Sequence, residues 1–298
     1  MTIVDDGVGE DLAQRAGESF PPTEAPASAA RATAAFVSGA LRSALSSVLW
    51  AAAGLVVLLA LWWLASVRAS DMPSPAEGWH ALSKMLSHPF YDNGPNDKGI
   101  GRQLGTSLGR VLKGFGLAVV VGAPLGFFMG ASRRVRQAAN PVVQLLRPVS
   151  PLAWFPIGLV VLKDSPNAAV FVLFITALWP IVINTAAGAA SIPADHRNVA
   201  KVFRLGGLSY VRHVMVPHTM PHLVTGLRLS MGVAWMVIVA VEMLAGGTGI
   251  GFYVWDSYNG GNLDRVVAAI LLIGALGYAI DAAFLRLAQR LTVEELDP

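Results

Sequence analysis

The chain contains no cysteine and little charge, since Asp, Glu, Lys and Arg make up only 14% of its 298 residues. Without cysteine, disulfides, thiolate metal sites and a thiol nucleophile are excluded. An ordinary soluble domain has about a quarter charged residues, whereas here 54% of residues are hydrophobic and the mean hydropathy is +0.55. This composition predicts an integral membrane protein.

Nucleotide-binding signatures are also missing. No GxxxxGK[ST] pattern occurs, so we expect no ATP binding by a P-loop on this chain. GGTGIG, residues 246–251, is the nearest approach to a dinucleotide fingerprint, but it follows an apolar helix pattern and opens no βαβ unit. We therefore interpret it as a helix stop and an external loop, and we expect no cofactor. The net charge of +3 is typical of basic cytoplasmic loops rather than of a nucleic-acid-binding protein.

No catalytic set of residues can be assembled from the sequence, which argues against an enzyme embedded in the membrane. His213, His218 and His222 cluster, and the last two have the spacing of neighbouring metal ligands on a helix. Pro217 and Pro221 interrupt the expected helix, so we interpret the three as solvated interfacial histidines.

Long apolar runs predict an all-α membrane protein with six crossings. Residues 1–40 are expected to form a disordered cytoplasmic tail, and residues 41–298 a transmembrane domain with its core at about 101–290. An amphipathic helix is expected in the extracytoplasmic connection, around Trp79 to Leu86. The crossings are placed at Ser46–Val67, within Leu104–Ala131, at Asn140–Lys163, at Asn167–Ala190, at about Leu223–Leu244 and at about Val266–Leu285.

Two crossings have unusual sequences. Four prolines break up the third crossing, and non-helical backbone is tolerated at membrane depth only against protein or a water-filled cavity. That crossing is therefore expected to face a transport path. Glycines recur every four residues in the second crossing, including Gly122, Gly126 and Gly130. This spacing permits close helix contact, and we expect it to serve packing within the chain more than a subunit interface.

A polar segment at 193–221 separates the fourth and fifth crossings. Its arginines and lysine are too costly for the membrane centre, so the segment is expected to be a loop. Val199, Val202 and Phe203 recur at helical spacing, which predicts a short amphipathic helix at the membrane surface or against a partner. The distribution of Lys and Arg places this loop, and both termini, in the cytoplasm.

Two stretches carry a resemblance to a known family. The polar segment is similar to the cytoplasmic coupling loop of the membrane subunits of bacterial ABC importers, whose pattern is Glu-Ala-Ala, a Gly four residues later, then Ile-x-Leu-Pro. Aligned at Pro217, the pattern puts Glu-Ala-Ala on Asn198, Val199 and Ala200, and its Gly on Arg204. The stretch GLRLSMGVAWMVIVAVEMLAGGTGIGFYVWDSYN, residues 226–259, closely resembles nitrate permeases and their relatives for bicarbonate, cyanate and sulfonates.

The resemblance implies the type I, MetI-like importer fold and a permease that is not itself an enzyme. It implies a homodimer in the bacterial inner membrane, working with two cytoplasmic ABC ATPase subunits and an external substrate-binding protein. The expected substrate is a small anion, nitrate or nitrite first, with bicarbonate, cyanate or a sulfonate such as taurine as alternatives. The residues expected to contact the ATPase are Asn198, Val199, Ala200, Lys201, Val202, Phe203, Arg204 and Pro217.

Five residues are candidates for the translocation path: Arg147, Trp154, Asn184, Trp235 and Glu242. Intramembrane ionisable residues are functional candidates by default, but Glu242 could instead pair with an arginine or with backbone donors. Arg147 could supply the positive charge for a passing anion, or its side chain could extend to the interface. A secondary transporter or channel is the rival class, yet neither clear inverted repeats nor buried ion-coupling residues are seen.

Overall fold

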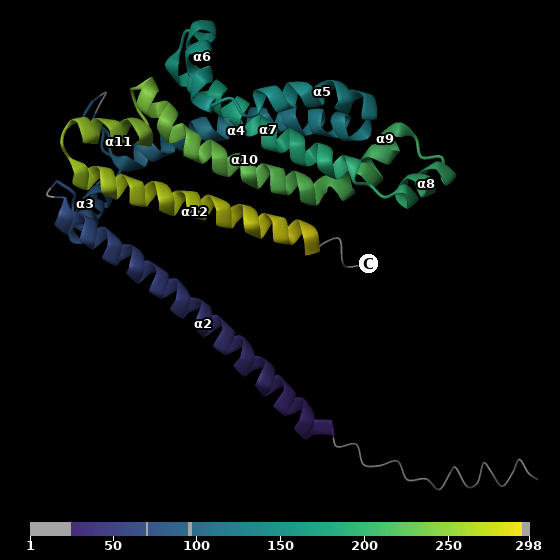
Figure 1. The fold of residues 1–298 in the computed structure, drawn as a ribbon, viewed down its shortest axis with the longest axis horizontal. Coiled ribbons are helices and arrows are strands. Elements are labelled where there is room, and N and C mark those ends of the chain that lie inside the picture. The colour runs from purple at the N-terminus through teal and green to yellow at the C-terminus, as the bar shows by residue number, and fades with distance from the viewer. Residues whose placement is uncertain (1–24, 70, 95–96, 294–298) are drawn as a thin grey trace, which may run out of the picture. The chain divides into compact units, whose positions relative to one another are not determined.

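A computed structural model describes residues 25–69, 71–94 and 97–293, and for residues 25–44, 197, 201 and 290–293 it describes only the backbone. Within this part of the chain the fold is all-α, as predicted, apart from an isolated bridge between Asp92 and Lys98. The elements are α2 (Ala25–Arg68), α3 (Pro75–Ser87), α4 (Ile100–Ala131), α5 (Arg133–Leu146), η1 (Pro151–Trp154), α6 (Phe155–Leu162), α7 (Ser165–Ala190), α8 (Ala194–Val202), α9 (Gly207–Tyr210), the π-helical η2 (Val211–Met215), α10 (Val216–Ala245), α11 (Ile250–Asn259) and α12 (Leu263–Val293) (Figure 1).

Five helical segments of the described chain are long and apolar enough to cross a membrane. A sixth crossing is obtained if α5 and the η1–α6 segment count as one span, bent by 95° at the break between them. The prolines cause this break, because Pro148 and Pro151 lack the N–H groups that would continue α5. The predicted break in this segment is therefore confirmed, and its crossing of the membrane stays a prediction. The five unbroken segments are Leu45–Arg68, Ile100–Ala131, Ser165–Ala190, Gly207–Ala245 and Leu263–Gln289.

Two compact units divide the chain, one ending at Leu64 and the other beginning at Ala65. The first unit contains most of α2, whose span Leu45–Arg68 has a mean hydropathy of 2.3 and agrees with the predicted first crossing. The prediction of a disordered tail to residue 40 is wrong for residues 25–40, because α2 already begins at Ala25. Residues 1–24 lie outside the described part of the chain.

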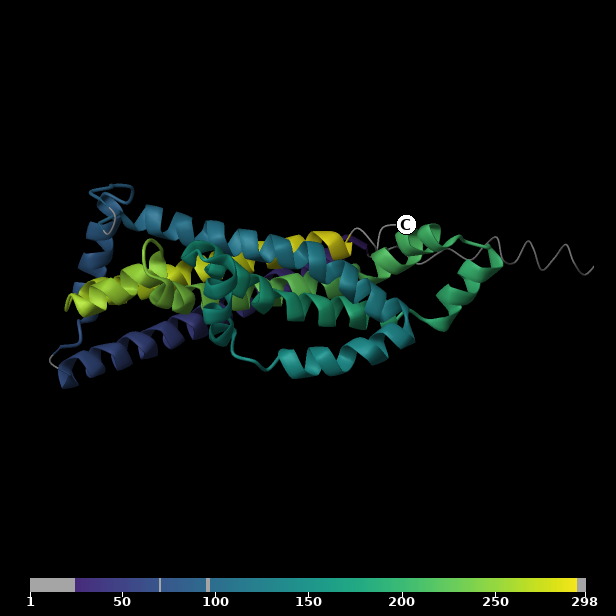
Figure 2. The same cartoon turned by 90° about the horizontal axis from the view of Figure 1, so that it is seen from above.

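The second unit is built on α7, which packs along α4 on one side and along α10 on the other (Figures 1 and 2). Glycines allow the close approach of α4: a Cβ on Gly126 would meet Thr185, and one on Gly130 would meet Ala189, both on α7. Gly122 faces Leu178 and Ile181 at closer than ordinary contact distance. The expectation of packing within the chain is confirmed for these three glycines.

The polar segment is more helical than the sequence predicted. Residues 207–245 form one continuous helical rod, although the loop was expected to extend to Pro221. Pro217 lies in the first turn of α10, where a missing N–H costs little, and Pro221 lies inside α10. The π-helical turn Val211–Met215 directly precedes these prolines. A helix of 39 residues is about 58 Å long, so it extends beyond the roughly 30 Å apolar core of a bilayer.

Outside the spans, α3 confirms the amphipathic helix expected around Trp79. Ser74 caps its first turn: the Ser74 hydroxyl accepts a hydrogen bond from the Glu77 N–H, and the Ser74 N–H donates to the Glu77 carboxylate. The Ser74 N–H and the Ser74 hydroxyl, which also donates to the Glu77 carboxylate, hold the pKa of Glu77 below its ordinary value.

Candidate coupling surface and translocation path

Two polar regions lie at opposite ends of the second unit. One end carries α8 and α9, where α7 ends and α10 begins, and the other carries α11, where α10 ends (Figures 1 and 2). Chain direction places them there, because α10 runs from Val216 to Ala245 between the two. A span that joins the two regions connects opposite faces of the membrane.

Helix α8 is the short helix that the polar segment predicts, and it ends in a specific cap. Arg204 has a left-handed backbone with φ of 46°, and the Leu205 N–H donates to the Ala200 carbonyl oxygen at 3.0 Å. This is the six-to-one bond of a Schellman cap, in which the left-handed position usually holds glycine. The family pattern places its Gly at this position in the alignment. The left-handed backbone conformation that favours glycine is therefore kept in this chain, although the residue at this position is Arg204.

Side chains at the end of α8 separate into an exposed set and a buried one. Val199, Val202 and Phe203 are 54%, 78% and 74% exposed, a high exposure for apolar groups. Ala200 is only 5% exposed and lines the inner side of the loop with Pro217. The sequence predicted that Ala200 contacts the ATPase, but its side chain is buried inside the loop and is not part of the exposed face. Asn198 and Arg204 are exposed, and Lys201 lies in α8.

A cavity of about 680 Å³ lies beneath α8. Because α10 is continuous through its prolines, His218 and His222 do lie one turn apart, contrary to the expectation that no helix holds them. No group of three or more His, Cys, Asp or Glu side chains within the described residues is placed to hold a metal. The four histidines that line the cavity are His196, His213, His218 and His222.

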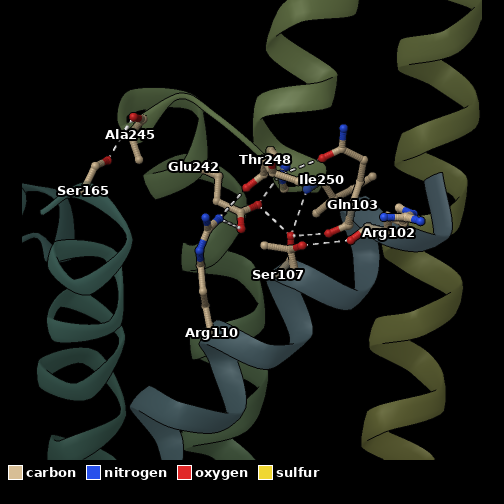
Figure 3. A network of polar contacts seen from close by, with 12 residues as sticks. Arg102, Gln103, Ser107, Arg110, Ser165, Glu242, Ala245, Thr248 and Ile250 are labelled. Atoms are coloured by element: carbon tan, nitrogen blue, oxygen red, sulfur yellow. Dashed lines mark hydrogen bonds and ion pairs between the residues drawn. The ribbon is translucent and has the colours of Figure 1, made fainter. Parts of the chain in front are cut away.

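At the other end, Glu242 is fully buried and ion-paired. Arg110 Nη1 lies 2.7 Å from Glu242 Oε1 and 2.6 Å from the Thr248 carbonyl oxygen (Figure 3). The Ser107 hydroxyl and the Gly251 N–H lie 2.7 Å and 3.0 Å from Glu242 Oε2. The alternative in which Glu242 pairs with an arginine and backbone donors is thus the arrangement observed. A role for Glu242 in the translocation path would require the Arg110–Glu242 ion pair to open, and that role stays a prediction.

The glycine-rich loop between α10 and α11 folds over this carboxylate. Gly249 donates its N–H to Gln103 Oε1 at 2.6 Å, and Ile250 donates to the Ser107 hydroxyl at 2.8 Å. A Cβ on Gly249 would overlap the Glu242 carboxylate, and Gly249 also has φ of 147°. The expectation of a helix stop is confirmed. In addition, the loop and the first turn of α11 together supply three N–H donors to the buried polar cluster.

Sequence reasoning missed the α4 side of this cluster. Gln103, Ser107 and Arg110 are spaced four and three residues apart, which places them on one helix face. Gln103 and Ser107 are 1% and 0% exposed. The signal that could have found them is a row of polar residues at helical spacing in one apolar segment, which could partner the isolated carboxylate of another.

The other candidate path residues are not brought together. Trp235 is 4% exposed, and its indole N–H donates to the Ile273 carbonyl oxygen at 3.1 Å. Asn184 donates to the Pro180 carbonyl oxygen and packs against Gly226 of α10. Trp154 packs on the core around Phe155. Arg147 lies at the break after α5 and lines a separate cavity between α5 and α7.

A second membrane ion pair joins α10 to α12. Arg228 Nε lies 2.6 Å from Asp281 Oδ1, and Arg228 Nη2 lies 2.8 Å from Asp281 Oδ2, a two-point contact. Both residues line a groove of about 650 Å³ beside Trp235. The arginine charge is therefore compensated inside the apolar segment.

Residues 122–293, well over half of the chain, match the family described as binding-protein-dependent transport system inner membrane component. The chain belongs to this family. It is 43% identical to the nitrate import permease protein NrtB of Synechocystis sp. over 77% of this chain and 84% of that protein. It is 41% identical to the bicarbonate transport system permease protein CmpB of the same organism, over 76% of this chain and 83% of that protein.

A more distant relative is the taurine transport system permease protein TauC of Escherichia coli, 29% identical over 80% of this chain and 86% of that protein. Among solved structures, the inward-facing methionine ABC transporter MetNI superposes with a TM-score of 0.57 at 18% identity, covering 64% of this chain and 95% of that one. The fold is therefore the MetI-like, type I importer fold.

Family membership settles the general role of the chain. It is a multi-pass permease subunit of an ABC importer in the inner membrane, and it works with an ATPase and a substrate-binding protein. ATP hydrolysis belongs to the ATPase subunits, so the permease itself is not an enzyme. The secondary-transporter alternative is set aside by the same finding.

Proposed function

We propose that this permease forms the membrane path of an ATP-driven nitrate importer. The observation that carries the proposal is the identity of 42 to 43% to nitrate import permeases from three organisms, each over at least 76% of this chain. Bicarbonate is the second candidate, because two bicarbonate permeases are 41% and 38% identical over similar lengths. Both ions are small, planar and singly charged.

The assembly we propose is a homodimer of permeases with two ATPase subunits and one binding protein. Val199, Val202 and Phe203 support the docking of α8 on an ATPase, since exposed apolar side chains on a polar helix are typical of a protein contact. We also propose that both termini lie in the cytoplasm with α8. An even number of crossings would put the termini on one side, and the basic turn at Arg133, Arg134 and Arg136 supports the cytoplasm as that side. Native mass spectrometry of the detergent-solubilised complex counts the permease copies directly.

ATPase stimulation tests the substrate. The complete complex, reconstituted in lipid, is mixed with its binding protein and with nitrate, nitrite, bicarbonate or taurine in turn. Stimulation by nitrate at lower concentration than by the other anions is the expected result. Stimulation by bicarbonate alone would transfer the assignment to the second candidate.

A further inference from the structure

We propose that Arg147, Gln144 and Asn140 form a transient binding site for one small, planar, singly charged oxyanion inside the membrane. This inference rests on the proposed function and identifies the residues that contact the substrate. The site is the cavity of about 470 Å³ between α5 and α7, lined by Asn140, Val143, Gln144, Arg147, Pro148 and Ile183.

Helix geometry brings the three polar side chains together. Asn140, Gln144 and Arg147 are spaced four and three residues apart on and just after α5, so they share one helix face. Arg147 comes 14 residues after Arg133, about 21 Å along the helix. If the basic turn at the start of α5 marks the membrane surface, the cavity extends well into the apolar layer.

The Arg147 guanidinium lacks the counter-charge that two other arginines of the apolar segments have. Arg110 is paired with Glu242 and Arg228 with Asp281. In the part of the chain that the structure describes, the Arg147 guanidinium has neither an ion pair nor a hydrogen bond. An uncompensated charge inside a membrane protein is costly and typically faces a water-filled cavity or an ion pathway.

The two amides add unused donors beside this charge. Neither the Asn140 nor the Gln144 side chain makes a hydrogen bond to any described residue, whereas Asn184, on α7, is bonded to Pro180. A guanidinium presents two parallel N–H groups that match the edge of a planar oxyanion, and an amide presents two more donors. Arg147 and Gln144 are exposed, so the ion stays partly hydrated, and such weak binding permits release.

The break in the crossing explains why the site lies here. Pro148 ends α5 directly after Arg147, and the chain turns by 95° into η1 and α6. The break lies beside the cavity that Ile183 of α7 lines together with Arg147 and Pro148. Arg147 and Pro148 thus line the same cavity.

The test uses the complete complex in proteoliposomes and follows uptake of labelled nitrate. Arg147→Gln is expected to lower the initial uptake rate at least tenfold while the complex still assembles. Arg147→Lys keeps the charge and should retain an intermediate rate, because a lysine lacks the two-point geometry. Gln144→Glu leaves Arg147 in place but compensates its charge, and it should lower uptake as strongly as Arg147→Gln.

Arg286→Gln is the matched control, since it removes an exposed arginine near the end of α12, and it should import at the wild-type rate. Wild-type uptake by Arg147→Gln would overturn the site. If the Arg147→Gln complex failed to assemble, the Gln144→Glu variant would decide. Uptake at the wild-type rate by Gln144→Glu would also overturn the site, because Arg147 would then have only a structural role. A wild-type complex that imports no oxyanion would instead refute the proposed function.

Discussion

Arg110 Nη1 bridges two groups at the end of the permease opposite to α8: it lies 2.7 Å from Glu242 Oε1 and 2.6 Å from the Thr248 carbonyl oxygen. The glutamate belongs to α10, the carbonyl to the following loop, and the arginine to α4. One nitrogen thus ties three segments together. Since Glu242 is 0% exposed, each charge depends on the other for compensation.

Removing one charge of this pair should therefore unfold the region. Glu242→Gln leaves Arg110 without a counter-charge, a change that typically costs about 3 to 5 kcal/mol in a buried pair. We expect a lower thermal unfolding temperature and a lower yield of folded permease. Arg102→Gln removes the exposed pair with Asp92, and it should change stability by about 0 to 1 kcal/mol.

A stable Glu242→Gln protein that has lost only transport would contradict this account. It would return Glu242 to the translocation path, the role that its position in the sequence suggested.

The loop over the carboxylate makes a separate prediction. Gly249→Ala adds a Cβ that overlaps the Glu242 carboxylate at a backbone conformation that favours glycine, so we expect a destabilisation of more than about 2 kcal/mol. Gly247→Ala is the matched variant, because Gly247 has φ of 87° but no neighbour within 4 Å of its Cβ position. It should carry only the backbone strain of about 1 kcal/mol. Equal melting temperatures for the two variants would show that the overlap is relieved without cost.

The cap of α8 can be tested at Arg204. Arg204→Gly removes the left-handed strain and should preserve or increase the protection of the Leu205 amide from hydrogen exchange. Arg204→Val should reduce that protection, because a β-branched residue disfavours φ of 46°. If valine left the exchange rate unchanged, the Schellman cap would not be what ends α8.

The two sets of α8 side chains should respond differently to substitution. Val202→Glu places a charge on the exposed face and should weaken ATPase binding, while the permease itself keeps its melting temperature. Ala200→Glu buries a charge inside the loop, a cost on the order of several kcal/mol, and should destabilise the loop even without ATPase. Pull-down of the ATPase and melting of the isolated permease separate the two effects. Normal ATPase binding by Val202→Glu would show that the docking face lies elsewhere.

Much of this fold follows from the sequence, because hydropathy and proline placement act locally. The apolar runs predicted the five unbroken spans, and the four prolines of the third apolar run predicted that it breaks. The break occurs at Pro148 and Pro151, whereas Pro141 lies inside α5. The helix boundaries of the polar segment were missed, because prolines usually end or kink a helix, whereas the helical span that begins at Gly207 continues through Pro217 and Pro221. Only tertiary packing decides between the two outcomes.

The polar sites were less predictable, because pairing joins residues far apart in sequence. Glu242 stands out in an apolar run, but Arg110 lies 132 positions away, and the sequence does not give the contact between α4 and α10. Ala200 and Val199 are neighbours in the coupling pattern, yet one is buried and the other exposed. Their difference depends on how α8 folds back onto the start of α10.

Accumulation of labelled nitrate is the most direct measurement of the central claim, that this permease provides the path for ATP-driven nitrate import. The complete complex is reconstituted in vesicles with the binding protein on one side and ATP on the other. We predict accumulation against a concentration gradient that requires ATP and binding protein and that stops when the partner ATPase carries an inactivating substitution. Nitrate flux that persists without ATP, or no nitrate uptake while bicarbonate accumulates, would contradict the account.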